Sequence, residues 1–186
     1  MRHLPIFILY TFISTAALAE TVLITGSSRG LGLEMTRQYA ADEWNVIATS
    51  RTPDDDVALQ SLAATHGNIQ IEKLDVTDHT EIDALARKLR STPIDVLINN
   101  AGILGNPGQQ QLGTLDFSAA NLMFATNTLG PLKVSEAFLD HVLASDTKKI
   151  ITISSIVGSI TNATGNIYFY RASKTAVNMM MVNMSV

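Results

Sequence analysis

The chain has 186 residues, of which 46% are hydrophobic and 16% charged, so it is long enough to bury the core of one globular domain and is not expected to be disordered. Its net charge of −4 provides no broad basic field, and we therefore exclude nucleic acid as a partner. The absence of cysteine excludes a disulfide framework, a thiolate metal site and a cysteine nucleophile.

The first nineteen residues form a distinct N-terminal segment. Arg2 and His3 precede an apolar run, Leu4 to Leu18, which ends in the small-x-small site Ala17 to Ala19 that signal peptidase cleaves. We expect residues 1–19 to be a signal peptide for export or the secretory pathway. An uncleaved membrane anchor, or an N-terminal core helix of a cytoplasmic protein, is the alternative, although the run is short for a membrane span. Membrane contact is expected only if this segment is retained.

From Glu20 onward, short apolar runs rich in β-branched residues alternate with longer segments of helical period. This alternation predicts βαβ units, and hence one three-layer α/β domain with a parallel sheet over residues 20–186. The expected strands are Val22–Thr25, Trp44–Ser50, Ile69–Leu74, Val96–Asn99 and Lys149–Ser155. The expected helices are Leu31–Ala41, Val57–Thr65, Glu81–Arg90 capped by Thr80, one long helix Asn121–Leu143 in which Pro131 is awkward, and Tyr168–Met184, with a loop at Gly102–Gly113.

A glycine-rich segment, Thr25 to Gly32, lies between the first strand and its helix. A dinucleotide pyrophosphate binds at this point in an α/β sheet, because glycines let the backbone approach and the helix N-terminus is electropositive. A glycine-rich turn of another origin is the alternative. After the second strand, a carboxylate would favour the ribose 2′-hydroxyl of NAD, whereas Arg51 stands there and Arg29 lies nearby. Unless both are merely solvated arginines, they favour NADP over NAD.

Tyr170 and Lys174 are four residues apart, so on a helix they share one face. A free tyrosine is a poor acid-base group at neutral pH, and a nearby ammonium lowers the pKa of a phenol. Tyr170 could then exchange a proton with a substrate oxygen. The pair alone is a weak signal, because a helix carries this spacing by chance.

The ordered motifs together resemble the short-chain dehydrogenase/reductase family, from Thr21 to Val186. Beside the glycine loop and the Tyr170–Lys174 pair, these motifs are Asp75-Val76, Asn99-Asn100-Ala101-Gly102, the Asn127 context Ala125 to Gly130, and the Ser155 context Ile151 to Gly158. The contexts of Ser155 and Tyr170 look most like the small carbonyl reductases of the sniffer and C-factor type.

The resemblance implies an NADP-dependent oxidoreductase of Rossmann-type doubly wound fold, which interconverts a carbonyl and an alcohol by hydride transfer. It implies a catalytic tetrad of Asn127, Ser155, Tyr170 and Lys174, with Ser154 the less favoured serine, and it implies no metal ligands. The implied cofactor-binding residues are Gly26, Ser28, Arg29, Gly30, Leu31, Gly32, Arg51, Asp75, Val76, Asn99, Ala101, Gly102, Tyr170 and Lys174.

The family normally continues past the tyrosine helix into further strands and a substrate-covering segment, so the resemblance implies that the last strands are lacking here. This leaves a non-catalytic nucleotide-binding or interaction protein, or an inactive fragment, as the alternative function. Family members often pair through the segment Asn121–Leu143 and the tyrosine helix, which implies a homodimer or tetramer. The run Met179 to Met181 either belongs to such a face or is ordinary core and surface.

Overall fold

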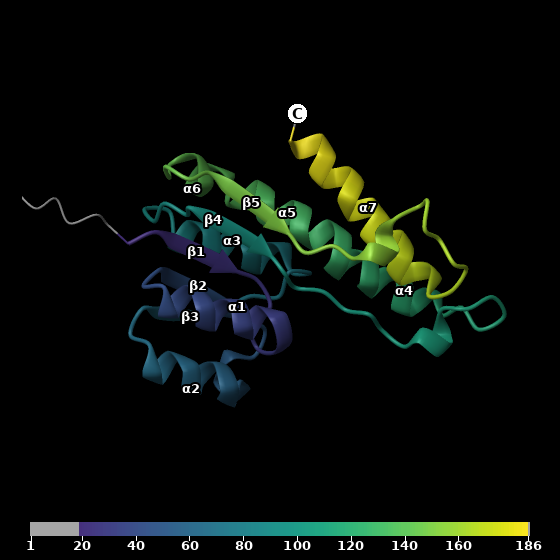
Figure 1. Cartoon of the computed structure of the whole chain (residues 1–186), viewed down its shortest axis with the longest axis horizontal. Helices are drawn as coiled ribbons and strands as arrows, with labels where there is room; N and C mark the ends of the chain where they lie inside the picture. The colour runs from purple at the N-terminus through teal and green to yellow at the C-terminus, as the bar shows by residue number, and fades with distance from the viewer. Residues whose placement is uncertain (1–18, 186) are drawn as a thin grey trace, which may run out of the picture.

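A computed structural model describes residues 19–185 and shows a parallel five-stranded sheet with helices on both faces (Figure 1). The strand order is β3-β2-β1-β4-β5, and every neighbouring pair is parallel. The expected doubly wound α/β fold is therefore confirmed. The strands are β1 (Thr21–Ile24), β2 (Asn45–Ser50), β3 (Ile69–Lys73), β4 (Val96–Asn99) and β5 (Lys149–Thr152). The α-helices are α1 (Gly30–Ala41), α2 (Val57–Thr65), α3 (His79–Lys88), α4 (Phe117–Phe124), α5 (Gly130–Ala137), α6 (Leu139–Leu143) and α7 (Tyr168–Met184).

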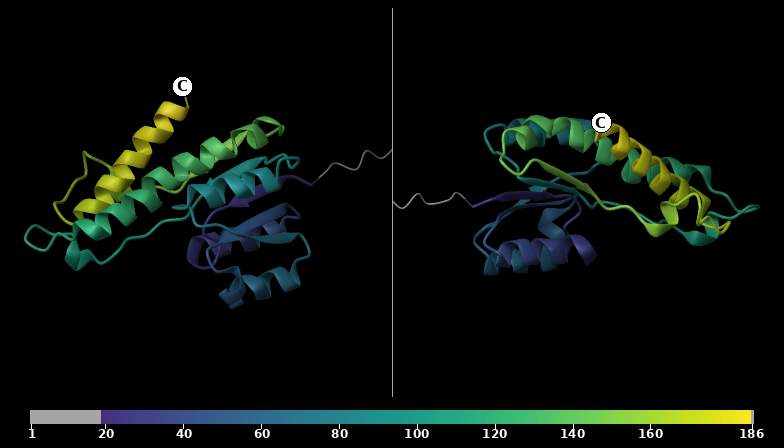
Figure 2. Two further views of the ribbon diagram at one scale, coloured as in Figure 1. Left: turned by 180° about the vertical axis from the view of Figure 1, so that it is seen from behind. Right: turned by 45° about the horizontal axis from the view of Figure 1, so that its top comes forward.

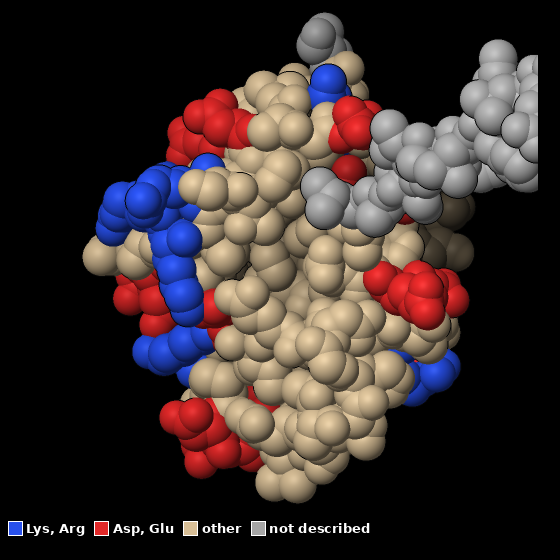
Figure 3. Space-filling model, turned by 90° about the vertical axis from the view of Figure 1, so that its left-hand side faces the viewer, with Lys and Arg blue, Asp and Glu red and all other residues tan. Residues whose placement is uncertain are grey.

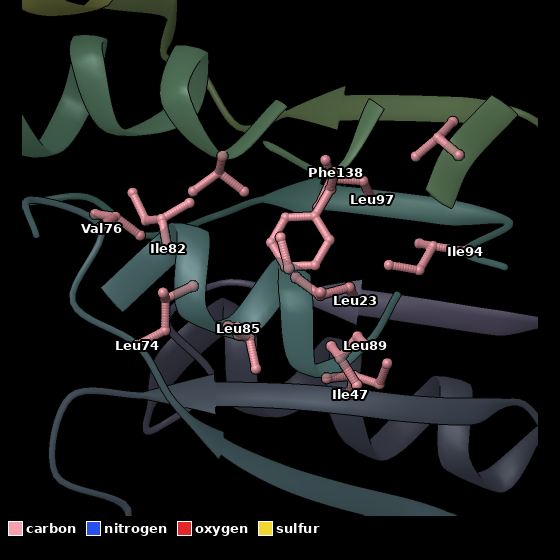
Figure 4. Close-up of a cluster of buried hydrophobic side chains, with 13 residues drawn as sticks. Leu23, Ile47, Leu74, Val76, Ile82, Leu85, Leu89, Ile94, Leu97 and Phe138 are labelled. Carbon is pink, nitrogen blue, oxygen red and sulfur yellow. The ribbon is translucent and has the colours of Figure 1, made fainter. Parts of the chain in front are cut away.

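The central strands are apolar on both faces because both faces are covered by helices. In β1, Val22 and Ile24 point to a cluster that includes residues of α1 and α2, whereas Leu23 points to the cluster formed with α3, α5 and α6. Figure 4 shows this second cluster around the ring of Phe138, which is fully buried. The further views in Figure 2 show the two helical layers on either side of the sheet.

The segment expected to form one long helix is divided. After α4 the backbone forms a π-helical turn, Ala125–Leu129, and a second interruption at Phe138 separates α5 from α6. Only Gly130 separates Pro131 from the π turn, and the proline lacks an amide donor and would crowd the carbonyl four residues earlier. The widened turn accommodates a proline that a regular α-helix would not, so the prediction of one continuous helix was wrong.

Two further expectations need correction. Asp78, not Thr80, caps α3, because its carboxylate accepts hydrogen bonds from the amides of Thr80 and Glu81. Strand β5 ends at Thr152 and not at Ser155. The Ile153 amide still donates to the Asn99 carbonyl, after which the chain leaves the sheet and enters a short 3₁₀ turn, Ile156–Gly158.

The two ends of the sheet differ in character. The face where the strands begin shows separate groups of basic and acidic side chains around an uncharged middle (Figure 3). The glycine loop and the other connections that carry the predicted site lie at the carboxyl ends of the strands. Within residues 19–185, no helix has both the length and the hydropathy needed to cross a membrane. The expected signal peptide or anchor lies almost entirely outside the described residues.

Candidate active site at the carboxyl edge of the sheet

The glycine loop packs against the end of β4 more closely than any side chain would allow. Gly26 has a φ of +71°, and a Cβ atom there would lie 2.9 Å from the Cα of Ala101. A Cβ on Gly32 would lie 2.2 Å from the Gly26 carbonyl oxygen. The backbone of the loop can therefore turn directly from β1 into α1, whose N-terminus faces the carboxyl edge of the sheet.

A cavity of about 320 Å³ opens beside this loop. It lies where the chain winds away from the centre of the sheet in both directions, between β1 and β4, which is the point where open α/β sheets bind ligands. Eleven of the predicted cofactor-binding residues line it, together with five that were not predicted. The predicted ones are Gly26, Ser28, Arg29, Gly30, Leu31, Gly32, Arg51, Asp75, Val76, Ala101 and Gly102, and the others are Ser50, Leu74, Asn100, Ile103 and Thr126.

The two arginines are both exposed at the rim of the cavity, Arg29 from the glycine loop and Arg51 from the residue after β2. Asp75 keeps its carboxylate near the cavity by accepting hydrogen bonds from the amide and hydroxyl of Thr77. The cavity thus combines a glycine cradle with two positive charges at its rim.

The two asparagines of the Asn99-Asn100-Ala101-Gly102 motif have separate positions. Asn99 is buried outside the cavity lining, and its side-chain amide donates to the hydroxyls of Ser135 and Thr152. Asn100 lines the cavity, and its amide donates to the carbonyls of Thr25 and Gly26 at 2.9 and 3.0 Å. Asn100 therefore holds the glycine loop, whereas Asn99 joins β4 to α5 and β5.

Tyr170 and Lys174 lie on the first turns of α7, as their spacing predicts. The Lys174 Nζ atom is 5.9 Å from the centre of the Tyr170 ring and donates to the carbonyl oxygen of Ile153 at 2.8 Å. The lysine is only 5% exposed, and its burial lowers the pKa of the ammonium from the ordinary 10.5. The pair therefore places a phenol hydroxyl and an ammonium side by side, an arrangement that can exchange a proton with a substrate oxygen.

Asn127 lies in the π turn and is almost fully buried. Its side chain binds the backbone of Ile103 twice, as acceptor from the amide and donor to the carbonyl, and it also donates to the Ser173 hydroxyl of α7 at 3.1 Å. A Cβ atom on Gly102 would lie 3.3 Å from Asn127 Oδ1 and 3.6 Å from Lys174 Nζ. Asn127 and Lys174 therefore meet at one edge of the cavity, beside Gly102.

Ser155 begins the 3₁₀ turn after β5, where its hydroxyl accepts a hydrogen bond from the Val157 amide at 3.3 Å. Ser154 points elsewhere, because its hydroxyl donates to the Asn178 side chain in the middle of α7. In the described part of the chain, no hydrogen bond joins Ser155 to Tyr170. The structure brings Asn127, Tyr170 and Lys174 together, and it places Ser155 on the connection that leads from β5 towards α7.

Gln110 was missed by the sequence analysis, which assigned its segment to a loop. It is 1% exposed, its side-chain oxygen accepts from the Tyr170 amide at 2.9 Å, and its backbone oxygen accepts from the Tyr168 amide at 3.1 Å. Three glutamines follow one another at this point, and no local pattern marks the middle one as buried. Only the folded chain shows that Gln110 contacts the tyrosine helix.

Residues 20–186 match the family model described as short chain dehydrogenase. The chain belongs to the short-chain dehydrogenase family. A curated relative, the 1-hydroxy-2-glutathionyl-2-methyl-3-butene dehydrogenase of Rhodococcus sp. (strain AD45), is 31% identical over 167 residues, which are 88% of this chain and 69% of the relative. The family assignment made from the motifs is thereby confirmed, and with it the assignment to the oxidoreductases.

Solved structures of carbonyl reductases are also similar. The NADPH-bound carbonyl reductase from chicken fatty liver is 34% identical with a TM-score of 0.81, over 90% of this chain and 70% of that one. Carbonyl reductase Sniffer of D. melanogaster is 30% identical with a TM-score of 0.78, over 90% of this chain and 75% of that one. The chain spans between 50% and 69% of the length of the first curated relatives that it matches.

Proposed function

We propose that the protein is an NADP(H)-dependent oxidoreductase that interconverts a small-molecule carbonyl compound and the corresponding alcohol. The observation that carries this proposal is that Asn127 and Lys174 meet beside Gly102, at the edge of a glycine-lined cavity, with the Tyr170 ring next to the lysine. A cavity without this cluster would suit nucleotide binding alone, and the cluster without the cavity would have no reactant to act on. Membership of the short-chain dehydrogenase family agrees with both the cavity and the side-chain cluster.

The cavity fits a dinucleotide. The glycine loop leaves backbone amides and the N-terminus of α1 free to approach a pyrophosphate, because Cβ atoms at Gly26 and Gly32 would collide with neighbouring backbone. Arg29 and Arg51 at the rim are suited to a ribose 2′-phosphate, and no acidic residue directly follows β2. Similar structures that contain bound NADP or NADPH support NADP as the cofactor of this chain.

The proposed roles of the protein groups follow from their positions. When bound, NADPH supplies the hydride. Tyr170 gives its phenolic proton to the oxygen of the carbonyl as the alcohol forms, and it takes the proton back in the reverse direction. Lys174 stabilises the phenolate, while Asn127 fixes the backbone at Ile103 beside the lysine. Ser155 donates its hydroxyl hydrogen to the substrate oxygen, after the Val157 amide has oriented the hydroxyl oxygen.

The proposal is tested by replacing Tyr170 with phenylalanine, which removes the acid-base group and keeps the ring. We expect turnover of a panel of carbonyl compounds with NADPH to fall by about a hundredfold or more, with the dissociation constant of NADPH little changed. Tyr168→Phe, two residues earlier on the same helix, is the matched control and should keep its activity. Undiminished turnover in Tyr170→Phe contradicts the proposed mechanism, and NADPH binding without turnover in the unaltered chain would indicate a non-catalytic nucleotide-binding protein.

We also propose, from the sequence alone, that residues 1–19 direct export, with a retained membrane anchor or a cytoplasmic protein as the alternative. The pattern of Arg2, His3, the apolar run and the Ala17 to Ala19 site supports this proposal. A homodimer or tetramer remains a proposal that rests on the habit of the family. The N-terminal residue of the protein from its own cells tests the signal peptide: Glu20 at the N-terminus supports cleavage, and a terminus within residues 1–19 contradicts it. The molar mass of the protein in solution tests the homodimer or tetramer.

A further inference from the structure

We propose that Gln110 is a positioning residue that fixes the first turn of α7, and with it Tyr170, against the loop that borders the cofactor cavity. The catalytic meaning of this inference rests on the function proposed above, whereas the structural contact does not. Gln110 lies 60 residues before Tyr170 in the sequence and directly follows the short 3₁₀ helix Pro107–Gln109. Its buried side chain joins the loop after β4 to α7 by a hydrogen bond to Tyr170. Asn127 makes a similar link, because it binds both Ile103 and Ser173.

The N-terminus of α7 lacks a local cap. The residue before the helix is Ile167, which has a φ of +43° and no side-chain oxygen to bind the free amides of the first turn. Gln110 supplies two acceptors in its place. Its backbone oxygen accepts from the amide of Tyr168 at 3.1 Å, and its side-chain oxygen accepts from the amide of Tyr170 at 2.9 Å. A helix N-terminus is thus capped by a residue distant in sequence.

The other half of the Gln110 amide binds the loop. Its Nε2 atom donates to the carbonyls of Leu104 at 2.7 Å and Asn106 at 3.4 Å. Just before these residues, Asn127 holds both backbone groups of Ile103, and Ile103 itself lines the cavity. The side-chain amide of Gln110 therefore connects the backbone of the loop after β4 to the backbone of Tyr170.

This connection determines where the Tyr170 phenol stands relative to Lys174. The lysine is held separately, through its hydrogen bond to Ile153 after β5. If the first turn of α7 frays, Tyr170 moves while Lys174 remains in place. A displacement of about 1 Å in a reacting group can lower a rate by about a hundredfold, so a small movement suffices.

The neighbouring glutamines provide matched controls. Gln109 and Gln111 are exposed, whereas Gln110 between them is 1% exposed. Replacement by methionine keeps the length of the side chain and removes the hydrogen bonds of the side-chain amide, while the backbone bond to the Tyr168 amide remains. Gln110→Met and Gln111→Met therefore introduce the same chemical change one residue apart, and only the first breaks the contact to Tyr170.

The experiment compares amide hydrogen exchange and steady-state kinetics in the unaltered chain and these two variants. In Gln110→Met we expect the Tyr170 amide to exchange about fivefold faster, which is the usual effect of losing a helix cap. We expect kcat to fall about tenfold or more with the KM for NADPH changed by less than about twofold. Gln111→Met should match the unaltered protein in each measurement.

Gln110→Glu keeps an oxygen acceptor near the electropositive helix N-terminus, and it should restore most of the protection of the Tyr170 amide relative to Gln110→Met. Equal exchange at Tyr170 in Gln110→Met and Gln111→Met overturns the inference, as does a rise in the KM for NADPH that accounts for the whole loss of rate. If the unaltered chain shows no turnover, the proposed function fails, while the exchange measurement still decides whether Gln110 holds α7.

Discussion

Lys174 shows at the scale of a single residue how the site departs from what stability alone would select. The residue is 5% exposed, its ammonium donates to the carbonyl of Ile153, and burial lowers its pKa from 10.5. A buried charge with a neutral partner costs free energy of folding. Such a group is expected where its charge acts on a neighbour, which here is the phenol of Tyr170.

The lowered pKa predicts how stability depends on pH. Above the pKa of Lys174 in the folded state and below 10.5, the unfolded chain binds more protons than the folded one, so the free energy of unfolding rises with pH. Lys174→Met lacks this dependence. Between pH 7 and pH 10, urea denaturation should therefore show the unaltered protein gaining stability relative to Lys174→Met. Lys149→Met, at an exposed position, is the control, and a constant difference between the protein and Lys174→Met over this range would contradict the account.

Residues differ in how far the sequence could assign them. Tyr170 and Lys174 were found because helical spacing brings them together, and the structure confirms that they share a face of α7. The sequence analysis named Asn99 and not Asn100 as cofactor-binding, whereas Asn100 is the one that lines the cavity. Strand alternation decides which side chain faces the sheet interior, and it ends at the strand terminus where these two residues lie. Gln110 could not be found at all, because its partners lie up to 60 residues away.

At the scale of the elements, strands were easier to predict than helix ends. The runs rich in Val and Ile gave each of the first four strands to within about one residue, because buried parallel strands are nearly continuous apolar segments. The helix over Asn121–Leu143 was predicted as one element because its periodicity continues through the π turn. That turn depends on Pro131 and on tertiary hydrogen bonds, among them one from the Thr128 hydroxyl to the Ser173 carbonyl.

The cap of α3 provides a prediction for one element. The Asp78 carboxylate accepts from the amides of Thr80 and Glu81 at 2.9 and 3.1 Å. Asp78→Ala should lower the free energy of unfolding by about 1 kcal/mol, because these two amides lose their acceptor. Urea denaturation measures the change, with Asp146→Ala as the control at an exposed position. A loss in Asp78→Ala no greater than in the control would show that the cap contributes little.

For the whole molecule, the order of the strands determines where chemistry can occur. Connections from β1, β2, β3 and β4 all reach the carboxyl edge of the sheet, and each contributes residues to the one cavity there. The connection after β5 brings the Ile153 carbonyl to Lys174 on α7. The site is assembled from segments that lie far apart in the sequence, so its geometry depends on the folded sheet. Local motifs therefore predicted which residues belong to the site better than how they are arranged.

The central claim is that this cavity binds NADP(H) and that Arg29 and Arg51 recognise its 2′-phosphate. A fluorescence titration of the purified protein with NADPH and, separately, with NADH tests it most directly. We predict saturable binding of NADPH that is at least about tenfold tighter than that of NADH. Arg51→Asp should remove most of this preference, because a carboxylate repels the phosphate and accepts from a free 2′-hydroxyl. Arg90→Asp is the control and should keep the preference, because Arg90 is exposed and does not line the cavity. Equal affinity for the two nucleotides, or no binding of either, would contradict the account.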